Sequence, residues 1–156
     1  MLPPFSHAQF FAVNAEALRL GALPSLEGNA LLRELVRCAT LAPSSHNTQC
    51  WKFRIEDQAI VITPDYARRC PVVDPDDHHL FVSLGCAAEN LVHAALAHGL
   101  KAEAAFDSAR EALRVALTPT AASRSPLFDA LPQRQCTRAG YDGKPLTAEE
   151  LRLLEK

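Results

Sequence analysis

One long apolar stretch limits the folds that this chain can adopt. Between Asp74 and Gly99, apolar side chains recur every three or four residues, which predicts a helix with a buried stripe. We expect Asp74 at the N-cap, Pro75 at the first helical position and Gly99 as the C-terminal stop. Small residues at 85–88 give a second backbone room to pack closely. A helix of this length and composition belongs at the centre of the fold or of a dimer.

The remaining elements follow from periodicity and from residues that break it. A helix over 28–41 is ended by Pro43, and a hairpin follows from Trp51 to Thr63. Thr147 and Glu150 form a capping box that begins a last helix. The other predicted elements are strands at 101–106 and 111–118 and a short helix at 127–131.

Composition places the chain among soluble globular proteins. Its 156 residues suit one domain, and 48% are hydrophobic while 22% are charged. A net charge of -2 disfavours nucleic-acid binding, because no basic stripe is available to displace counterions from phosphates. No run approaches the roughly 18 consecutive apolar residues of a membrane span, and the first residues lack a signal-peptide pattern. We therefore expect a cytoplasmic protein.

The cysteines and histidines do not form a recognisable ligand pattern. The five cysteines are odd in number and none forms a CxxC pair, so we expect reduced thiols rather than disulfides or zinc. His78 and His79 stand near three aspartates, but adjacent helical residues point about 100° apart and cannot easily share one ion. No metal site is expected. Glu89 and His93 are one helical turn apart, which favours an ordinary side-chain contact over an acid–base pair.

The stretch APSSHNTQCWKF, residues 42–53, carries more hydrogen-bonding groups than a turn needs. Ser44, Ser45, Asn47 and Gln49 stand between a helix end and a strand start. Such a rim can bind the edge of a flat, polar ligand. The same residues can instead satisfy their own backbone through Asx-turns and Ser/Thr-turns. Both interpretations stay open on the chemistry alone.

The same stretch resembles the helix-exit motif of the nitroreductase-like flavoproteins, Ala-Pro-Ser-x-x-Asn-x-Gln-Pro-Trp. Cys50 stands where that family usually has proline. The following segment, residues 68–100, is similar to the long central helix of the Acg-type branch, in which two nitroreductase halves are fused in one chain. The similar regions cover roughly 30–154. The residues that match in register are Ala42, Pro43, Ser44, Asn47, Gln49, Trp51 and Phe53.

The resemblance implies an α+β fold with a small, mostly antiparallel sheet, flanking helices and one long central helix. It also implies that the loop contacts flavin mononucleotide (FMN) across a subunit or half-domain boundary. Ser44, Ser45, Asn47 and Gln49 would hold the edge of the flavin. Arg134 and Arg138 would hold its phosphate, since a guanidinium forms paired bonds to phosphate. The alternative for these two residues is that they are exposed arginines before a turn, because Cys136 replaces an expected hydroxyl residue.

The implied organisation is one half domain with the beginning of another. We expect an N-terminal extension over 1–27, a nitroreductase-like half over 28–132, and the start of a second, truncated half over 133–156. The chain would then be a fragment or a truncated form of a longer protein. A missing C-terminal half or a homodimer would complete the site.

The implied function is an FMN-dependent oxidoreductase that passes electrons from NAD(P)H to a nitro or quinone acceptor. The cofactor carries this chemistry, so no catalytic side chain is expected. The competing hypothesis is a non-catalytic module that binds or sequesters flavin, or is purely structural. Turnover therefore stays undecided on the sequence.

Overall fold

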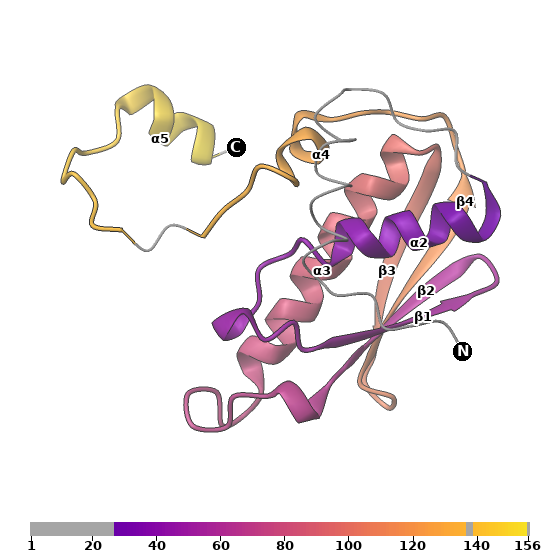
Figure 1. Cartoon of the computed structure of the whole chain (residues 1–156). Helices are drawn as coiled ribbons and strands as arrows, with labels where there is room; N and C mark the ends of the chain where they lie inside the picture. Colours follow the sequence, from indigo (N-terminus) through magenta and orange to yellow (C-terminus); the bar gives the residue numbers. More distant parts are fainter. Residues whose placement is uncertain (1–26, 137–138, 156) are drawn as a thin grey trace.

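The structure is a computed structural model that describes residues 27–136 and 139–155. It has an α+β fold in which the long helix α3 packs against one face of a four-stranded sheet and α2 packs across α3 (Figure 1). The predicted fold class is confirmed. The elements of the described residues are α2 (Gly28–Ala39), η1 (Ser45–Asn47), β1 (Trp51–Glu56), β2 (Ala59–Pro64), η2 (Tyr66–Arg68), α3 (His78–Ala97), β3 (Leu100–Asp107), β4 (Ala112–Pro119), α4 (Pro126–Ala130) and α5 (Ala148–Leu154).

The sheet has the order β1-β2-β4-β3, and all its pairs are antiparallel. Two hairpins, β1–β2 and β3–β4, match the predicted strands. They are joined by the pairing of β2 with β4, where Ile60 lies opposite Val115. Because side chains alternate between faces, both of these residues point to the core, while their neighbours on the strands, such as Arg114, face outward. The pairing of non-consecutive strands was not predicted.

Helix α3 supplies the centre of the core, as expected. Leu84 and Leu91 have no exposed surface, and they pack in one cluster with Leu35 of α2 and Ile60 of β2. Phe128 of α4 closes the same cluster and is 2% exposed. Burying a leucine side chain contributes about 1.5–3 kcal/mol. These contacts fix α3 rigidly between the sheet and α2.

The predicted start of this helix is wrong by one turn. The helix begins at His78, after Asp77 in the left-handed conformation (φ 57°), and not at Pro75. Asp74 still caps the helix, but from further back in the chain. Its carboxylate accepts hydrogen bonds from the main-chain N–H groups of His79 and Leu80, both at 2.9 Å. The reason is that a loop at 70–77 brings the carboxylate over the helix end, which sequence spacing does not reveal.

Only part of the small-residue patch at 85–88 is packed against the rest of the described chain. Ala87 and Ala88 are buried, whereas Gly85 is exposed, and a Cβ placed there would meet no heavy atom of the described chain within 4 Å.

Within the described residues, only α3 has the length and mean hydropathy (1.5) of a membrane span. Of that window 56% is buried, and the core helix of a soluble protein passes the same test.

The last part of the described chain leaves the body of the fold. Figure 1 shows the segment after α4 extending away and ending in α5. The capping box of Thr147 and Glu150 is present as predicted, with bonds in both directions. Side chains from Ala139 to Arg152 are exposed. The proposed division at residue 133 stays a prediction, and residues 1–26 lie outside the described residues.

Candidate functional site

The polar loop lies between the end of α2 and the start of β1, against the N-terminal half of α3 (Figure 1). One residue of α3 holds it there. The main-chain N–H of Ser45 donates to Ser83 Oγ at 3.3 Å, and Ser83 Oγ donates to the carbonyl of His79 at 2.6 Å. Ser83 is 3% exposed. The loop is therefore positioned by a buried hydroxyl on the central helix.

Ser44 and Thr48 close the loop on itself. Ser44 Oγ accepts a hydrogen bond from the N–H of Gln49 at 2.9 Å, and Thr48 Oγ1 donates to the carbonyl of Ser45 at 3.0 Å. The N–H of Asn47 donates to the carbonyl of Ser44 at 2.9 Å. The Thr48 bond, to a carbonyl three residues back, is of the local Ser/Thr kind, whereas the Ser44 bond spans five residues and closes the loop. Ser44 therefore has a structural role in the loop, although its hydroxyl proton is left to donate elsewhere.

The other predicted ligand residues are held differently. Asn47 and Gln49 lie in the left-handed region, with φ of 56° and 50°, and so does His46 with φ of 50°. Asparagine and histidine adopt this region more readily than most residues, and Gln58, Asp77 and Glu111 adopt it in other turns of the described chain, so the conformation itself indicates a tight turn. Within the described residues, the side chains of Ser45, Asn47 and Gln49 form no hydrogen bond. Their polar groups are therefore available to a ligand.

Arg134 lies at the entrance to the loop. Its Nη2 donates to the main-chain carbonyl of Leu41 at 2.9 Å, and its Nη1 lies 3.3 Å from Cys136 Sγ. The structure thus brings one of the two predicted phosphate ligands beside the loop. Arg138 lies outside the described residues, so its predicted role stays untested.

A second arginine at the loop was missed by the sequence analysis. Arg68 Nη1 donates to the carbonyl of Thr48 at 3.2 Å, and Arg68 Nε lies 3.6 Å from Asp65 Oδ2. The loop therefore lies between two cations, with Arg134 at its start and Arg68 at its end. The sequence shows an Arg68-Arg69 pair, but Arg68 is 20 positions from Thr48, so its contact with the loop could not be predicted from the sequence.

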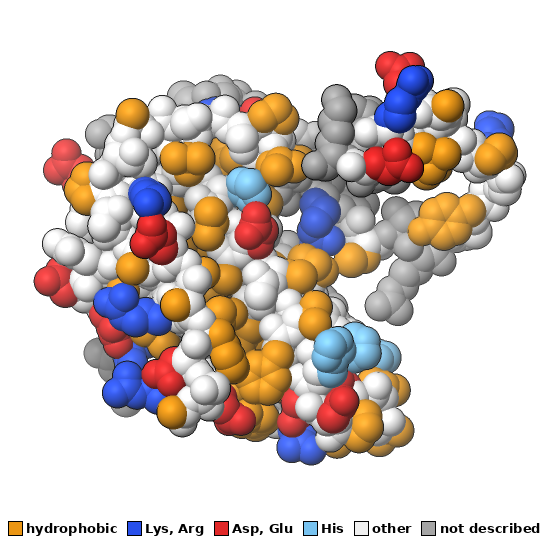
Figure 2. Space-filling model, turned by 180° about the vertical axis from the view of Figure 1, so that it is seen from behind, with side chains coloured by type: hydrophobic (Ala, Val, Ile, Leu, Met, Phe, Trp, Pro, Cys, Tyr) orange, Lys and Arg blue, Asp and Glu red, His pale blue; other side chains and the backbone are white. Residues whose placement is uncertain are grey.

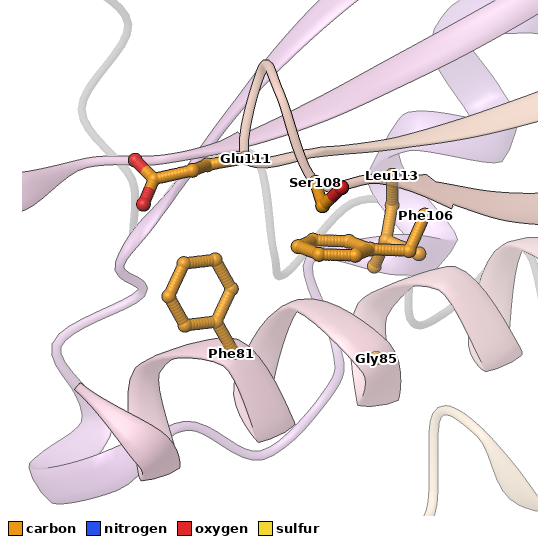
Figure 3. Close-up of a pocket in the computed structure, with 6 residues that line it drawn as sticks. All are labelled: Phe81, Gly85, Phe106, Ser108, Glu111 and Leu113. Atoms are coloured by element: carbon orange, nitrogen blue, oxygen red, sulfur yellow. The ribbon is translucent and has the colours of Figure 1, made fainter. Parts of the chain in front are cut away.

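A groove on another side of α3 was also missed. It has a volume of about 540 Å³ and runs between α3 and the tip of the β3–β4 hairpin (Figure 3). The pairing of β3 with β4 creates it, so no continuous motif marks it in the sequence. Its described lining residues are Phe81, Gly85, Phe106, Ser108, Glu111 and Leu113.

The groove combines aromatic walls with one carboxylate. The rings of Phe81 and Phe106 meet edge to face, with centroids 5.8 Å apart and planes at 85°. Phe106 is 54% exposed. At the rim, the hydroxyl of Tyr66 donates to Glu111 Oε2 at 2.7 Å, and this bond with the carboxylate raises the pKa of Tyr66. Figure 2 shows a face of the molecule on which hydrophobic side chains gather between charged ones.

The loop and the groove lie on different sides of α3. Phe81 and Gly85 are four residues apart and share one face of the helix, whereas Ser83, between them, points about 200° away from each. Ser83 binds the loop, and the other two residues line the groove. One helix therefore separates the two features within a single chain.

Three polar or ionisable side chains near the C-terminal end of α3 are part of the core packing: Arg37, Cys38 and His98. Arg37 of α2 is 7% exposed and binds both oxygens of Glu34, at 2.8 and 2.5 Å. Burial raises the pKa of the adjacent Cys38 thiol to about 12. His98, at the C-terminal end of α3, stacks edge to face on Phe128, and burial lowers its pKa. These groups stabilise the packing of α2, α3 and α4.

The structure also shows the positions of the Glu89–His93 pair, the five cysteines and the His, Cys, Asp and Glu side chains that could bind a metal. His93 Nε2 and Glu89 Oε1 are 3.1 Å apart, as the predicted side-chain contact requires. All five cysteines are free thiols, of which Cys38 and Cys50 are buried and Cys136 is exposed. Within residues 27–136 and 139–155, no group of three His, Cys, Asp or Glu side chains could hold a metal ion.

Comparisons with known proteins agree with this fold. No family model matches the chain. Two curated relatives from two strains of Mycobacterium tuberculosis, each named "Putative NAD(P)H nitroreductase", are 29% identical over 132 residues, covering 79% of this chain and 38% of the relative. A solved nitroreductase family protein from Streptococcus pneumoniae TIGR4 has a TM-score of 0.50 and 18% identity, covering 67% of this chain and 86% of that one. The fold is therefore nitroreductase-like, and the chain spans 38% of the length of its curated relatives.

Proposed function

We propose that this chain forms part of an FMN-dependent oxidoreductase that passes electrons from NAD(P)H to a nitro or quinone acceptor. The observation that carries the proposal is the polar loop. Asn47 and Gln49 lie in a tight turn with positive φ, and their side-chain amides have no hydrogen-bond partner among the described residues. The relatives named as NAD(P)H nitroreductases support the same class of reaction.

The donor set of the loop fits a flavin. The polar edge of the flavin ring alternates carbonyl acceptors with ring nitrogens, and an amide offers both a donor and an acceptor to such an edge. Asn47 and Gln49 supply two amides, and Ser45 supplies a hydroxyl. Arg134 and Arg138 would hold the phosphate by charge-assisted hydrogen bonds. The ligand set proposed from the sequence is kept, with Ser44 acting mainly as a support.

Ser45, Asn47 and Gln49 would hold the flavin edge, and the bound cofactor would supply hydride-transfer chemistry between NAD(P)H and the acceptor. For a nitro compound the balance is R–NO₂ + NAD(P)H + H⁺ → R–NO + NAD(P)⁺ + H₂O. The protein residues would orient the ring and tune its potential by hydrogen bonds to the ring edge, which requires no acid or base from the chain. This division of roles explains why the loop offers amides and hydroxyls.

The site requires a neighbour. The resemblance implies that the loop contacts the flavin across a boundary between two subunits or half domains. We propose that a second half or a second copy of the chain faces the loop and supplies the opposite surface. The exposed segment from Ala139 to Arg152 supports an additional partner surface, since its side chains are not buried by the described chain.

A visible spectrum tests the proposal. Protein purified with added FMN and then freed of excess should show oxidised-flavin absorption, and NADPH or NADH should bleach it under anaerobic conditions. Bound flavin that no nicotinamide bleaches would favour the alternative of a flavin-binding module without turnover. A protein that remains colourless after FMN is added would contradict both flavin hypotheses.

A further inference from the structure

The groove beside α3 has the features of a small-molecule site in its own right. Its volume of about 540 Å³ lies within the 300–1,000 Å³ that is usual for ligand pockets. Phe81 and Leu113 give it apolar walls, and the missing side chain at Gly85 leaves its floor open. In Figure 3, Phe81 rises from α3 toward the hairpin and the ring of Phe106 lies beside it. This shape suits a flat ring.

The charge of the groove has one sign. Among its described lining residues, Glu111 alone is charged, and its carboxylate is held at the rim by the hydroxyl of Tyr66. The pKa of that hydroxyl is raised by its bond to Glu111, by burial and by Asp77, and lowered by Arg69, which is itself paired with Asp77. The negative charge at the rim is therefore that of Glu111. The two phenylalanine rings meet edge to face, and a ring face that this contact leaves free carries the negative side of the ring quadrupole, which attracts cations.

A different hollow of about 380 Å³ opens on the outer face of the sheet. Its three arginines are paired with carboxylates that line the same hollow: Arg54 and Arg114 lie near Glu56, and Arg110 lies near Asp107. Charges of both signs therefore meet there, whereas Glu111 is the charged residue among the described residues that line the groove.

We propose that the groove binds a planar aromatic cation, with its ring over Gly85 against Phe81 and Phe106 and its charge beside Glu111. Two features support this occupant: the open floor at Gly85 beside the paired aromatic rings fits the ring, and the carboxylate of Glu111 fits the charge. The proposal goes beyond the proposed function, because binding to the groove requires neither flavin nor nicotinamide.

Three bicyclic probes of similar size and different charge test it by isothermal titration calorimetry near neutral pH. They are N-methylquinolinium, a cation; quinoline, which is neutral under these conditions; and naphthalene-2-carboxylate, an anion. We expect the cation to bind most tightly and the anion most weakly. Equal binding of the cation and the anion would overturn the proposal.

Glu111→Gln tests the charge, because glutamine keeps an acceptor for Tyr66 while removing the negative charge. We expect N-methylquinolinium to bind about fivefold more weakly, as is usual for a partly exposed charge contact, with quinoline unchanged. Arg114→Gln, in the other hollow, is the matched control and should leave both unchanged. An unchanged affinity of Glu111→Gln for the cation would contradict the role of the carboxylate.

Gly85→Leu tests the location. Leucine favours a helix more than glycine does, and a Cβ at this position meets no neighbour, so the variant should fold at least as stably as the parent. Its side chain should fill the floor and abolish binding of both N-methylquinolinium and quinoline. Val82→Ala, an exposed neighbour on the same helix that does not line the groove, should bind normally. Retained binding by Gly85→Leu would place the ligand elsewhere and overturn the proposal.

Discussion

The guanidinium of Arg134 donates a hydrogen bond to the main-chain carbonyl of Leu41 at 2.9 Å, across 93 positions of sequence. This bond attaches the segment after α4 to the entrance of the polar loop. It places a cation where the loop begins, while Arg68 stands where the loop ends. A dianionic group bound near the loop entrance would therefore lie close to a donor that has further N–H groups to offer.

The first prediction concerns that arginine. Arg134→Gln should bind FMN about tenfold more weakly, because one charge-assisted contact to phosphate is lost. Riboflavin, which lacks the phosphate, should bind the variant and the parent equally. The measurement is quenching of flavin fluorescence on titration. Arg33→Gln, an exposed arginine on α2, is the control.

An equal loss for both flavins would mean that Arg134 acts only by holding the loop through Leu41. No change for either flavin would remove Arg134 from the site.

The sequence predicts the elements of this fold well, and the causes are local. Periodicity defines α3 and both hairpins, and the pattern of Thr147 and Glu150 defines a capping box. The beginning of α3 was misplaced because the Asp74 carboxylate reaches N–H groups five and six positions further on. Local propensity cannot anticipate a cap that depends on the path of a loop. The pairing of β2 with β4 is likewise a tertiary choice.

The second prediction follows from that cap. Asp74→Ala should lower the melting temperature, because the N–H groups of His79 and Leu80 lose their acceptor in the first turn of α3. Asp74→Asn should fall between the parent and the alanine variant, since it keeps one acceptor oxygen. Asp57→Ala, in the exposed turn between β1 and β2, should have little effect. Calorimetry gives the order, and equal melting temperatures for Asp74→Ala and Asp57→Ala would contradict the cap.

The third prediction concerns pH. Burial holds the pKa of His98 below its ordinary value of about 6.5, with Glu34 acting to raise it and Arg37 to lower it. The unfolded chain therefore binds the proton more readily than the folded one. The contribution of neutral His98 to stability is fully present above about pH 6.5 and is lost as the pH falls from there toward the folded pKa.

Urea unfolding at a series of pH values measures this effect. His98→Gln should show a smaller loss of stability than the parent as the pH falls through that window. His46→Gln, an exposed histidine in the polar loop, should follow the parent. Parallel curves for the parent and His98→Gln would show that His98 does not contribute.

The fourth prediction concerns the thiols. Burial raises the pKa of Cys38 to about 12, so almost none of it is thiolate near neutral pH, and the thiolate is the reactive form. Iodoacetamide should modify the exposed Cys136 first and leave Cys38 unmodified until the protein unfolds. Peptide mass spectrometry over time shows the order. Modification of Cys38 in the native protein at the rate of Cys136 would contradict its burial.

The residues of the candidate site, like the elements of the fold, were predicted from the sequence where they are contiguous and missed where they meet only in the folded chain. Ser45, Asn47 and Gln49 were found from one contiguous motif, since a loop keeps its ligand residues together in sequence. Arg68 and the groove at Phe81 and Phe106 were not found, because they meet other parts of the site only through the path of the chain. The structural role of Ser44 was also not predicted, because the sequence does not distinguish a serine that closes a loop from a serine that binds a ligand.

The account is tested most directly by FMN titration of the double variant Asn47→Gly/Gln49→Gly. Both residues have positive φ, which glycine adopts readily, so the loop should keep its conformation, which circular dichroism and the melting temperature can verify. If the two amides hold the flavin edge, the parent should quench flavin fluorescence saturably and the variant should bind at least tenfold more weakly, roughly the loss of one or more hydrogen bonds. A folded variant that binds FMN as tightly as the parent would contradict the central claim.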